Sequence, residues 1–322
     1  MQSNLLDNVR QSCCRVVEHA SFVKIDASRL REYARSLPVE KVKAPELDGE
    51  RHYLGNGEDT AAFLITLDAI NFGSGYFPHL KKRVGMSGYF TVASSLTDYY
   101  RKKGPLLPYS LSKLTPEECA VIFGQDINNE PVIELMGLFS KALNDLGNFI
   151  LERYNGSFAS MVEDAGSSSK RLVEILVRMP FFNDRVQYKG FDVHFYKRAQ
   201  ITPADLAIAF EGKGLGKFDD LSELTIFADN LVPHVLRIDR VLVYDESLAS
   251  RIDSGELIVS GSQEEIEMRA SAVHTGELLV KEFREMGHEV RAMDIDYLLW
   301  NRGQEPYYKQ IKPRHRARSI FY

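Results

Sequence analysis

Apolar residues recur along much of the chain at the three- and four-residue spacing that is typical of amphipathic helices. The clearest case is the stretch 132–154, whose apolar stripe consists of Leu135, Phe139, Ala142, Leu146 and Phe149. Gly156 follows this stretch and is expected to end the helix. A second apolar stretch, 60–72, is closed by Gly73. These patterns predict helices that each bury one face.

Local signals mark where two further helices begin. Thr115 precedes a proline and lies three residues before Glu118, which is the arrangement of a capped helix start. Ser262 and Glu265 have the spacing of a capping box. They are followed by a long helical pattern whose shared apolar face consists of Ile266, Ala270, Val273, Val280 and Phe283.

Strand signals are few and short. Two β-prone runs within 186–196 flank Lys189 and Gly190 and predict a small hairpin. Strands and helices do not alternate as they would in a doubly wound sheet, and no internal repeat is visible. We therefore expect a mainly α-helical protein with a few short β-strands, organised as a single compact unit over residues 1–322.

Composition places the chain among ordinary globular proteins. Hydrophobic residues make up 44% of the 322 residues and charged residues 26%, and 45 acids against 40 bases give a net charge of −5. A surface that attracts DNA everywhere is usually basic, so any anionic ligand must meet a local patch. No stretch approaches the ~18 uncharged apolar residues that a membrane span requires, so no membrane association is expected.

Cysteines and histidines suggest neither a disulfide framework nor a metal site. The three cysteines are the adjacent pair Cys13 and Cys14 and the distant Cys119, a pattern that fits a reducing compartment such as the cytoplasm. The eight histidines never adopt a metal-ligand spacing. The glycine cluster 212–216 follows a predicted helix rather than a strand, so it fails the context of a dinucleotide-binding loop.

The segment 202–236 has the layout of a helix-hairpin-helix module. Thr202 and Pro203 are expected to open a helix that runs to about residue 211, and the glycines that follow allow a tight turn. Ser222 then caps a second predicted helix, which carries Leu224, Phe227, Leu231 and Val235. Turn amides in such modules hold phosphate. An ordinary turn between two helices explains the same residues equally simply.

Asp229 stands out within that second predicted helix. Apolar residues flank it, and Pro233 follows four residues later. A carboxylate in apolar surroundings suits a reaction whose transition state is cationic. The plainer interpretation is an exposed acid on an amphipathic helix.

The C-terminal stretch is locally cationic. Residues 309–318 hold five lysines or arginines together with His315 and no acid, so they suit either a phosphate ligand or a solvated basic tail. The apolar ending 320–322 is expected to dock on the protein. Trp300 lies just upstream and stacks either on a base or within the core.

Several segments together resemble one family. They are Phe-Tyr-Lys-Arg-Ala-Gln-Ile at 195–201, Gly-Lys-Gly at 212–214, Leu-Thr-Ile-Phe-Ala-Asp at 224–229 and Pro-Arg-His-Arg-Ala-Arg at 313–318. The stretch 68–72 and the pair Ser12 and Cys13 fit as well. The sequence is similar to the queuosine salvage proteins, the queuosine 5′-phosphate N-glycosylase/hydrolase family, and the likeness runs nearly from end to end.

This resemblance implies a fold similar to helix-hairpin-helix DNA glycosylases and a small-molecule substrate, queuosine 5′-monophosphate. The implied reaction releases queuine, a 7-deazaguanine base, for reuse in tRNA modification, with Asp229 as the catalytic carboxylate and no cofactor or metal. We expect a cytoplasmic monomer without a stable nucleic-acid partner. Two other classes remain as alternatives, a DNA base glycosylase and a non-enzymatic nucleotide- or nucleic-acid-binding protein, and the net negative charge disfavours both.

The resemblance also implies a set of substrate-binding residues. They are His52, Asn71, Lys197, Arg198, Phe227, Asn230, Asp296, Tyr297, Trp300, Arg314 and His315. Lys197, Arg198 and Arg314 are the candidates for the phosphate. Asp296 either reads the guanine-like edge of the base or caps a helix at 297–300. Asn230 departs from the tyrosine found in some relatives, which leaves the contacts to the cyclopentenediol arm open.

Overall fold

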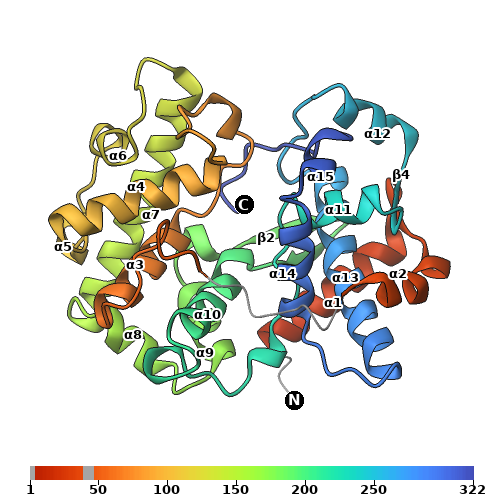
Figure 1. Cartoon of the computed structure of the whole chain (residues 1–322), viewed down its shortest axis with the longest axis horizontal. Helices are drawn as coiled ribbons and strands as arrows, with labels where there is room; N and C mark the ends of the chain where they lie inside the picture. Colours follow the sequence, from red (N-terminus) through yellow and green to blue (C-terminus); the bar gives the residue numbers. More distant parts are fainter. Residues whose placement is uncertain (1–3, 39–46) are drawn as a thin grey trace. The chain divides into compact units, whose positions relative to one another are not determined.

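The computed structural model describes residues 4–38 and 47–322, which gather into two compact units (Figure 1). The first unit comprises Met1–Pro45, Asp184–Gln200 and Asp220–Arg318. The second comprises Glu46–Asn183, Ile201–Asp219 and Ser319–Tyr322. Each unit therefore draws on stretches that are far apart in the sequence. The expectation of a single unit over residues 1–322 stays a prediction.

The first unit combines helices with two small antiparallel sheets. Its α-helices are α1 (Leu5–His19), α2 (Leu30–Ser36), α11 (Val232–Ile238), α12 (Glu246–Asp253), α13 (Gln263–Glu285), α14 (Ala292–Arg302) and α15 (Pro306–Gln310). One sheet pairs β1 (Val23–Ile25) with β4 (Leu242–Tyr244), and the other pairs β2 (Arg185–Tyr188) with β3 (Phe191–His194). Short 3₁₀ turns are η1 (Ala27–Arg29) and η6 (Leu221–Glu223).

Helix α13 is the centre of the first unit. It packs against α1, α2, α11 and α14. Its apolar face is buried as the sequence predicts, except that Val280 is half-buried. Gly276 lets the chain at Ile226 come very close, because a Cβ at this glycine would lie 2.2 Å from the Ile226 Cγ1. The helix therefore packs directly against the stretch that carries Asp229.

The second unit is helical within the described residues. Its helices are α3 (Glu58–Ala69), α4 (Gly88–Lys103), α5 (Pro108–Leu111), α6 (Pro116–Phe123), α7 (Glu130–Tyr154), α8 (Phe158–Asp164) and α9 (Ser169–Leu176), with 3₁₀ turns η3 (Phe77–His79), η4 (Pro180–Phe182) and η5 (Gly214–Gly216). Helix α7 is the long amphipathic helix, and it contacts α3, α5, α6 and α8. Helix α10 (Lys197–Ala209) begins in the first unit and ends in the second.

The elements with strong local signals are confirmed. The fold is mainly helical with a few short strands. Thr115 and Glu118 form the capping box of α6, and Ser262 accepts a hydrogen bond from the Glu265 N–H at the start of α13. The hairpin turns at Lys189 and Gly190, both with positive φ. The structure contains no helix, among the residues it describes, that is long and apolar enough to cross a membrane.

The predicted secondary structure of 202–236 is wrong in two places. Helix α10 begins at Lys197, so Pro203 lies inside it rather than at its start. The second helix is short and begins at Val232, and residues 224–229 form neither helix nor strand. The apolar spacing of Leu224, Phe227 and Leu231 imitates a helix, but these side chains are buried in an irregular segment.

One buried carboxylate ties two parts of the first unit to α13. Glu267 is fully buried, and its Oε2 accepts the backbone N–H groups of Ser21 (2.9 Å), Phe22 (2.6 Å) and Val23 (3.2 Å). Its Oε1 accepts the Tyr188 hydroxyl at 2.8 Å. The start of β1 and the β2–β3 hairpin are therefore anchored on a single helix position.

The first prediction follows from this anchor. Glu267→Ala leaves buried donors without their acceptor, and a single such loss costs about 1–3 kcal/mol. We expect the free energy of unfolding to fall by at least about 2 kcal/mol, measured by thermal and urea denaturation. Glu285→Ala on the same helix is the control, because Glu285 is 49% exposed and only 4.0 Å from Lys281. It should change stability by less than about 0.5 kcal/mol. Equal stability of the two variants would contradict the anchoring role.

Candidate active site

Asp229 lies where the irregular segment turns into helix α11. Its Oδ1 accepts the backbone N–H groups of Leu231 at 2.8 Å and Val232 at 3.0 Å. The side chain is half-buried, while Phe227, Ala228 and the residues on its C-terminal side are buried. The carboxylate is thus held in one orientation by its own backbone, in surroundings that are largely apolar.

A second carboxylate, Asp296 on α14, lies within electrostatic range of Asp229. Asp296 is buried, and its Oδ1 accepts the Phe227 N–H at 2.8 Å. Burial, together with the negative charge of Asp229, raises the pKa of Asp296 well above its ordinary value. The Phe227 N–H and the positive charge of Lys197 oppose that rise in pKa without cancelling it.

The alternative role of Asp296 as a helix cap is wrong. Helix α14 begins at Ala292, so Asp296 lies in its interior. The capping role belongs to Asp294, whose carboxylate accepts the Arg291 N–H at 3.0 Å. The short apolar run after Asp296 suggested a later start, whereas the helix begins four residues before Asp296, at Ala292.

Two cations accompany the two carboxylates. Lys197, the first residue of α10, is 7% exposed, and its charge acts on Asp296. Arg314 is exposed to solvent, and its charge and that of Asp229 act on each other. The third predicted phosphate ligand, Arg198, is buried at 1% exposure. Arg314 is therefore the most exposed residue of the three, although burial around its guanidinium lowers the pKa of that group.

Aromatic rings line the same part of the first unit. Phe227 and Tyr297 meet edge to face, with ring centroids 5.7 Å apart and planes at 75°. Tyr297 and Trp300 are half-buried and lie one turn apart on α14. These rings offer apolar faces and edges next to Asp296, which a planar heterocycle would need for stacking.

The C-terminal basic stretch is docked rather than solvated between residues 315 and 317. The Asn230 side-chain amide donates to the His315 carbonyl at 3.0 Å, and Ile258 N–H donates to the Arg316 carbonyl at 2.8 Å. Burial, together with the positive groups nearby, lowers the pKa of His315 to about 3. His315 is therefore a neutral, buried residue at neutral pH. The predicted docking of the chain end is confirmed by Tyr322, which is 2% exposed.

His52 and Asn71 belong to the second unit and are described on their own. His52 is buried, its Nδ1 donates to the Asp48 carbonyl (3.0 Å), and its Nε2 accepts from the Tyr89 hydroxyl (3.1 Å). Burial lowers the pKa of His52, so the ring is neutral. Asn71 follows the end of α3 and is half-buried.

Sequence reasoning missed two charged residues in this part of the first unit, Asp184 and Arg269. Both are almost fully buried, and they pair at 2.5 Å between Arg269 Nη2 and Asp184 Oδ2. The one signal in the sequence is the four-residue spacing of Glu265 and Arg269, which is typical of an exposed helix pair. Among the described residues, no three His, Cys, Asp or Glu side chains gather as a metal site requires.

The groups around Asp229 are those of a particular class of protein. A held carboxylate, a second buried carboxylate, aromatic rings and cations are the parts that a hydrolytic enzyme needs to act on a small, anionic, ring-containing substrate.

Comparison with known proteins gives the family. A family model described as queuosine salvage protein matches residues 51–322. A Sphaerobacter thermophilus protein named queuosine 5′-phosphate N-glycosylase/hydrolase is 36% identical over 313 residues, or 96% of this chain and 95% of the relative. Relatives of the same name from Dictyostelium discoideum and Mus musculus are 33% and 30% identical and cover 99% and 97% of the chain, and 100% and 98% of their own lengths. The chain belongs to the queuosine salvage protein family.

The raised pKa of Asp296 leads to a prediction about stability and pH. The native protein keeps the Asp296 proton to higher pH than the unfolded chain, in which the pKa is about 3.9. Stability is therefore lost as the pH rises from about 4 to the raised pKa. Asp296→Asn keeps an oxygen acceptor for the Phe227 N–H and has no such loss.

We expect the free energy of unfolding of Asp296→Asn, minus that of the wild type, to increase with pH over this range. Urea denaturation at a series of pH values between 4 and 8 measures it. A difference that stays constant over the whole series would show that burial does not perturb this carboxyl group.

Proposed function

We propose that this protein hydrolyses the N-glycosidic bond of queuosine 5′-phosphate and releases queuine. The observation that carries the proposal is the Asp229 carboxylate, held by two backbone N–H groups beside a second carboxylate. The relatives named queuosine 5′-phosphate N-glycosylase/hydrolase, which match nearly the whole chain, support the same reaction.

The proposed chemistry uses Asp229 to stabilise a cation. As the bond between the ribose C1′ and the base nitrogen breaks, positive charge develops on C1′ and the ring oxygen. The carboxylate stabilises this charge, either as an ion or by bonding to C1′. Water then supplies hydroxide to C1′ and a proton to the departing base nitrogen. A 7-deazapurine lacks the ring nitrogen whose protonation helps an ordinary purine to leave, so catalysis depends more strongly on the carboxylate.

In this proposal Asp296 recognises the base. The guanine-like edge of queuine presents two N–H donors, at N1 and at the exocyclic amine, which match a carboxylate. Ionised Asp296 is the form that accepts both, so binding of the base opposes the rise in the pKa of Asp296 that burial and Asp229 cause in the free site. Phe227 and Tyr297 lie next to this carboxylate and supply aromatic contacts to the ring.

The remaining assignments are also proposals. Lys197, Arg198 and Arg314 bind the 5′-phosphate, and His52, Asn71, Asn230, Trp300 and His315 contribute to substrate binding. The helix-hairpin-helix glycosylase-like architecture, the monomeric state, the cytoplasmic location and the absence of a stable nucleic-acid partner remain predictions. A DNA base glycosylase or a binding protein without activity is the alternative that a direct assay excludes.

The decisive experiment is a turnover assay. The protein is incubated with queuosine 5′-phosphate, and free queuine is followed by mass spectrometry. We expect Asp229→Asn to reduce kcat at least ~100-fold, because one preorganised electrostatic stabiliser is lost, while the substrate still binds. The same assay with a duplex oligonucleotide should release no base.

Asp245→Asn is the matched control for this variant. Asp245 Oδ1 accepts the Ser247 N–H at 2.9 Å at the start of α12, much as Asp229 does at the start of α11. The control loses the same kind of capping carboxylate, so it should keep turnover within about twofold of the wild type while sharing any cost to stability. Turnover by Asp229→Asn that matches the control would remove Asp229 from the mechanism.

The phosphate sites give a fourth prediction. A charge-assisted contact to phosphate contributes roughly 1.5–3 kcal/mol, so kcat/KM should be at least about tenfold higher for the monophosphate than for the nucleoside. Arg314→Gln should reduce the ratio of kcat/KM for the monophosphate to kcat/KM for the nucleoside. The control Arg240→Gln, at an exposed arginine just after α11, should leave this ratio unchanged. Equal efficiency with nucleoside and monophosphate in the wild type would mean that the phosphate is not recognised.

A further inference from the structure

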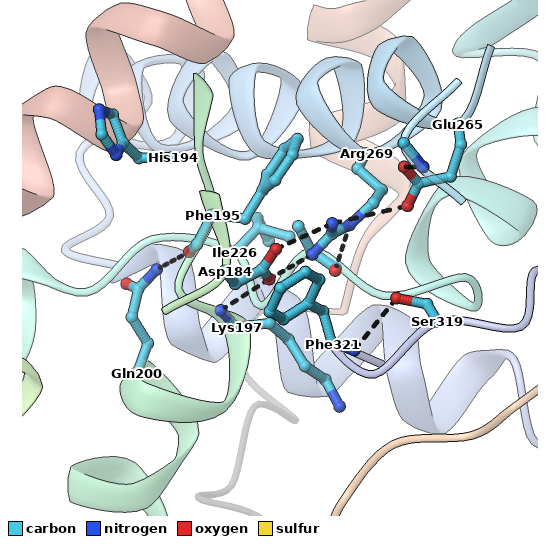
Figure 2. A network of polar contacts seen from close by, with 12 residues as sticks. Asp184, His194, Phe195, Lys197, Gln200, Ile226, Glu265, Arg269, Ser319 and Phe321 are labelled. Atoms are coloured by element: carbon cyan, nitrogen blue, oxygen red, sulfur yellow. Dashed lines mark hydrogen bonds and ion pairs between the residues drawn. The ribbon is translucent and has the colours of Figure 1, made fainter. Parts of the chain in front are cut away.

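A single buried guanidinium contacts the backbone next to Asp229. Arg269 projects from α13, and its Nε donates to the Ala228 carbonyl at 3.0 Å. Its two terminal nitrogens donate to both oxygens of Asp184, at 3.1 Å and 2.5 Å, and Glu265 lies 3.5 Å from Nη1 (Figure 2). The Phe195 ring covers the guanidinium, with its centroid 4.0 Å from Cζ.

The Ala228 carbonyl is an informative contact because it immediately precedes Asp229. Residues 224–229 belong to no helix or strand, so no regular ladder fixes their backbone. Side chains far away in the sequence fix it instead: Gln200 accepts the Thr225 N–H at 2.9 Å, Asp296 accepts the Phe227 N–H, and Arg269 donates to the Ala228 carbonyl, which is the contact nearest to Asp229. The orientation of the Asp229 backbone therefore depends on Arg269.

The same guanidinium reaches the segment that carries Lys197. The Asp184 carboxylate, which Arg269 holds by both oxygens, also accepts the Lys197 N–H at 3.4 Å. The Asp184 carbonyl accepts the N–H groups of Phe195 at 3.0 Å and Tyr196 at 3.3 Å. The Lys197 side chain points away from the ion pair (Figure 2). Arg269 thus links the backbone of Asp229 to the backbone of Lys197 through one carboxylate.

Stability alone is a poor explanation for this arrangement. Arg269 and Asp184 have side chains only 2% and 3% exposed, and burying such a pair costs desolvation energy that well-packed apolar residues avoid. What an ion pair of this kind adds is fixed geometry, since the planar fork of arginine satisfies a carboxylate and a carbonyl at once. Lysine has no such fork.

We infer that Arg269 is a positioning residue, which fixes the segment carrying Asp229 and, through Asp184, the backbone at Lys197. The kinetic consequence rests on the proposed function, whereas the structural consequence does not. A displacement of about 1 Å at a reacting group costs on the order of 100-fold in rate. Loss of the fork should therefore lower kcat and leave substrate affinity nearly intact.

The test uses Arg269→Lys in the full-length protein with two measurements. Hydrogen–deuterium exchange is read on peptides covering 227–232, where we expect at least about tenfold faster exchange, because amides there lose a fixed backbone. In the queuine-release assay kcat should fall about 100-fold with KM changed less than about threefold. Asp184→Asn, which keeps one acceptor oxygen, should shift both readouts in the same direction and to a smaller extent.

Arg10→Lys is the matched control. Arg10 also joins α13 to a backbone carbonyl: its Nε lies 3.0 Å from Glu277 on that helix, and its Nη2 donates to the Glu223 carbonyl at 2.6 Å. The Glu223 carbonyl lies six residues before Asp229, whereas the Ala228 carbonyl immediately precedes it. We therefore expect the Arg10→Lys variant to match the wild type in its exchange at 227–232 and in its kcat.

The two measurements separate the two ideas. If Arg269→Lys shows faster exchange at 227–232 but the wild-type protein releases no queuine, the positioning role is supported and the proposed function is wrong. Unchanged exchange there, or a rise in KM with normal kcat, would overturn the inference. If Arg269→Lys does not accumulate in folded form, Asp184→Asn alone decides by the same criteria.

Discussion

The first unit depends on the requirement that every charge buried along α13 be paired. Glu265, Glu267 and Arg269 lie within little more than one turn of this helix and are each at most 3% exposed. An unpaired charge at these positions would cost several kcal/mol, so each side chain dictates where its partner must lie. Glu267 accepts hydrogen bonds from the backbone at the start of β1, and Arg269 donates hydrogen bonds to Asp184 and to the Ala228 carbonyl. Apolar packing makes the unit compact, while these charges determine which segments meet.

Elements whose determinants are local could be predicted from the sequence. The capping box of α6, the long stripe of α7 and the Lys189 turn all rely on residues within a few positions of one another. The segment 224–229 failed for the opposite reason. Its apolar spacing satisfies a helix, but Ala228 and Phe227 hydrogen-bond to Arg269 and Asp296, which lie 41 and 69 residues away, respectively. Tertiary contacts that overrule local propensity leave no trace in a short window of sequence.

The residues of the candidate site also divide into those that could be identified from the sequence and those that could not. Asp229 and Asp296 were identifiable through resemblance to a family, and their proximity then appears in the raised pKa of Asp296. Asp184 and Arg269 were not identifiable, because a single arginine in a helical pattern gives no sign that it is buried. Even for Asp229 the predicted surroundings were only half right: the apolar neighbours are there, but the carboxylate closes a turn instead of lying along a helix.

The division of the first unit among distant stretches has a consequence for how the protein is made. Arg10 of α1 and Glu277 of α13, which pair at 3.0 Å, are 267 positions apart. At roughly 5–20 residues per second, a ribosome needs on the order of 15–50 s to synthesise the chain between them. The apolar face of α1, formed by Leu6, Val9, Cys13 and Val16, has no α13 to cover it during that time. The helices α3 to α9 are contiguous in the chain and emerge after α1 but well before α13. Nascent chains of this protein should therefore bind chaperones through their earliest helix until translation is nearly complete.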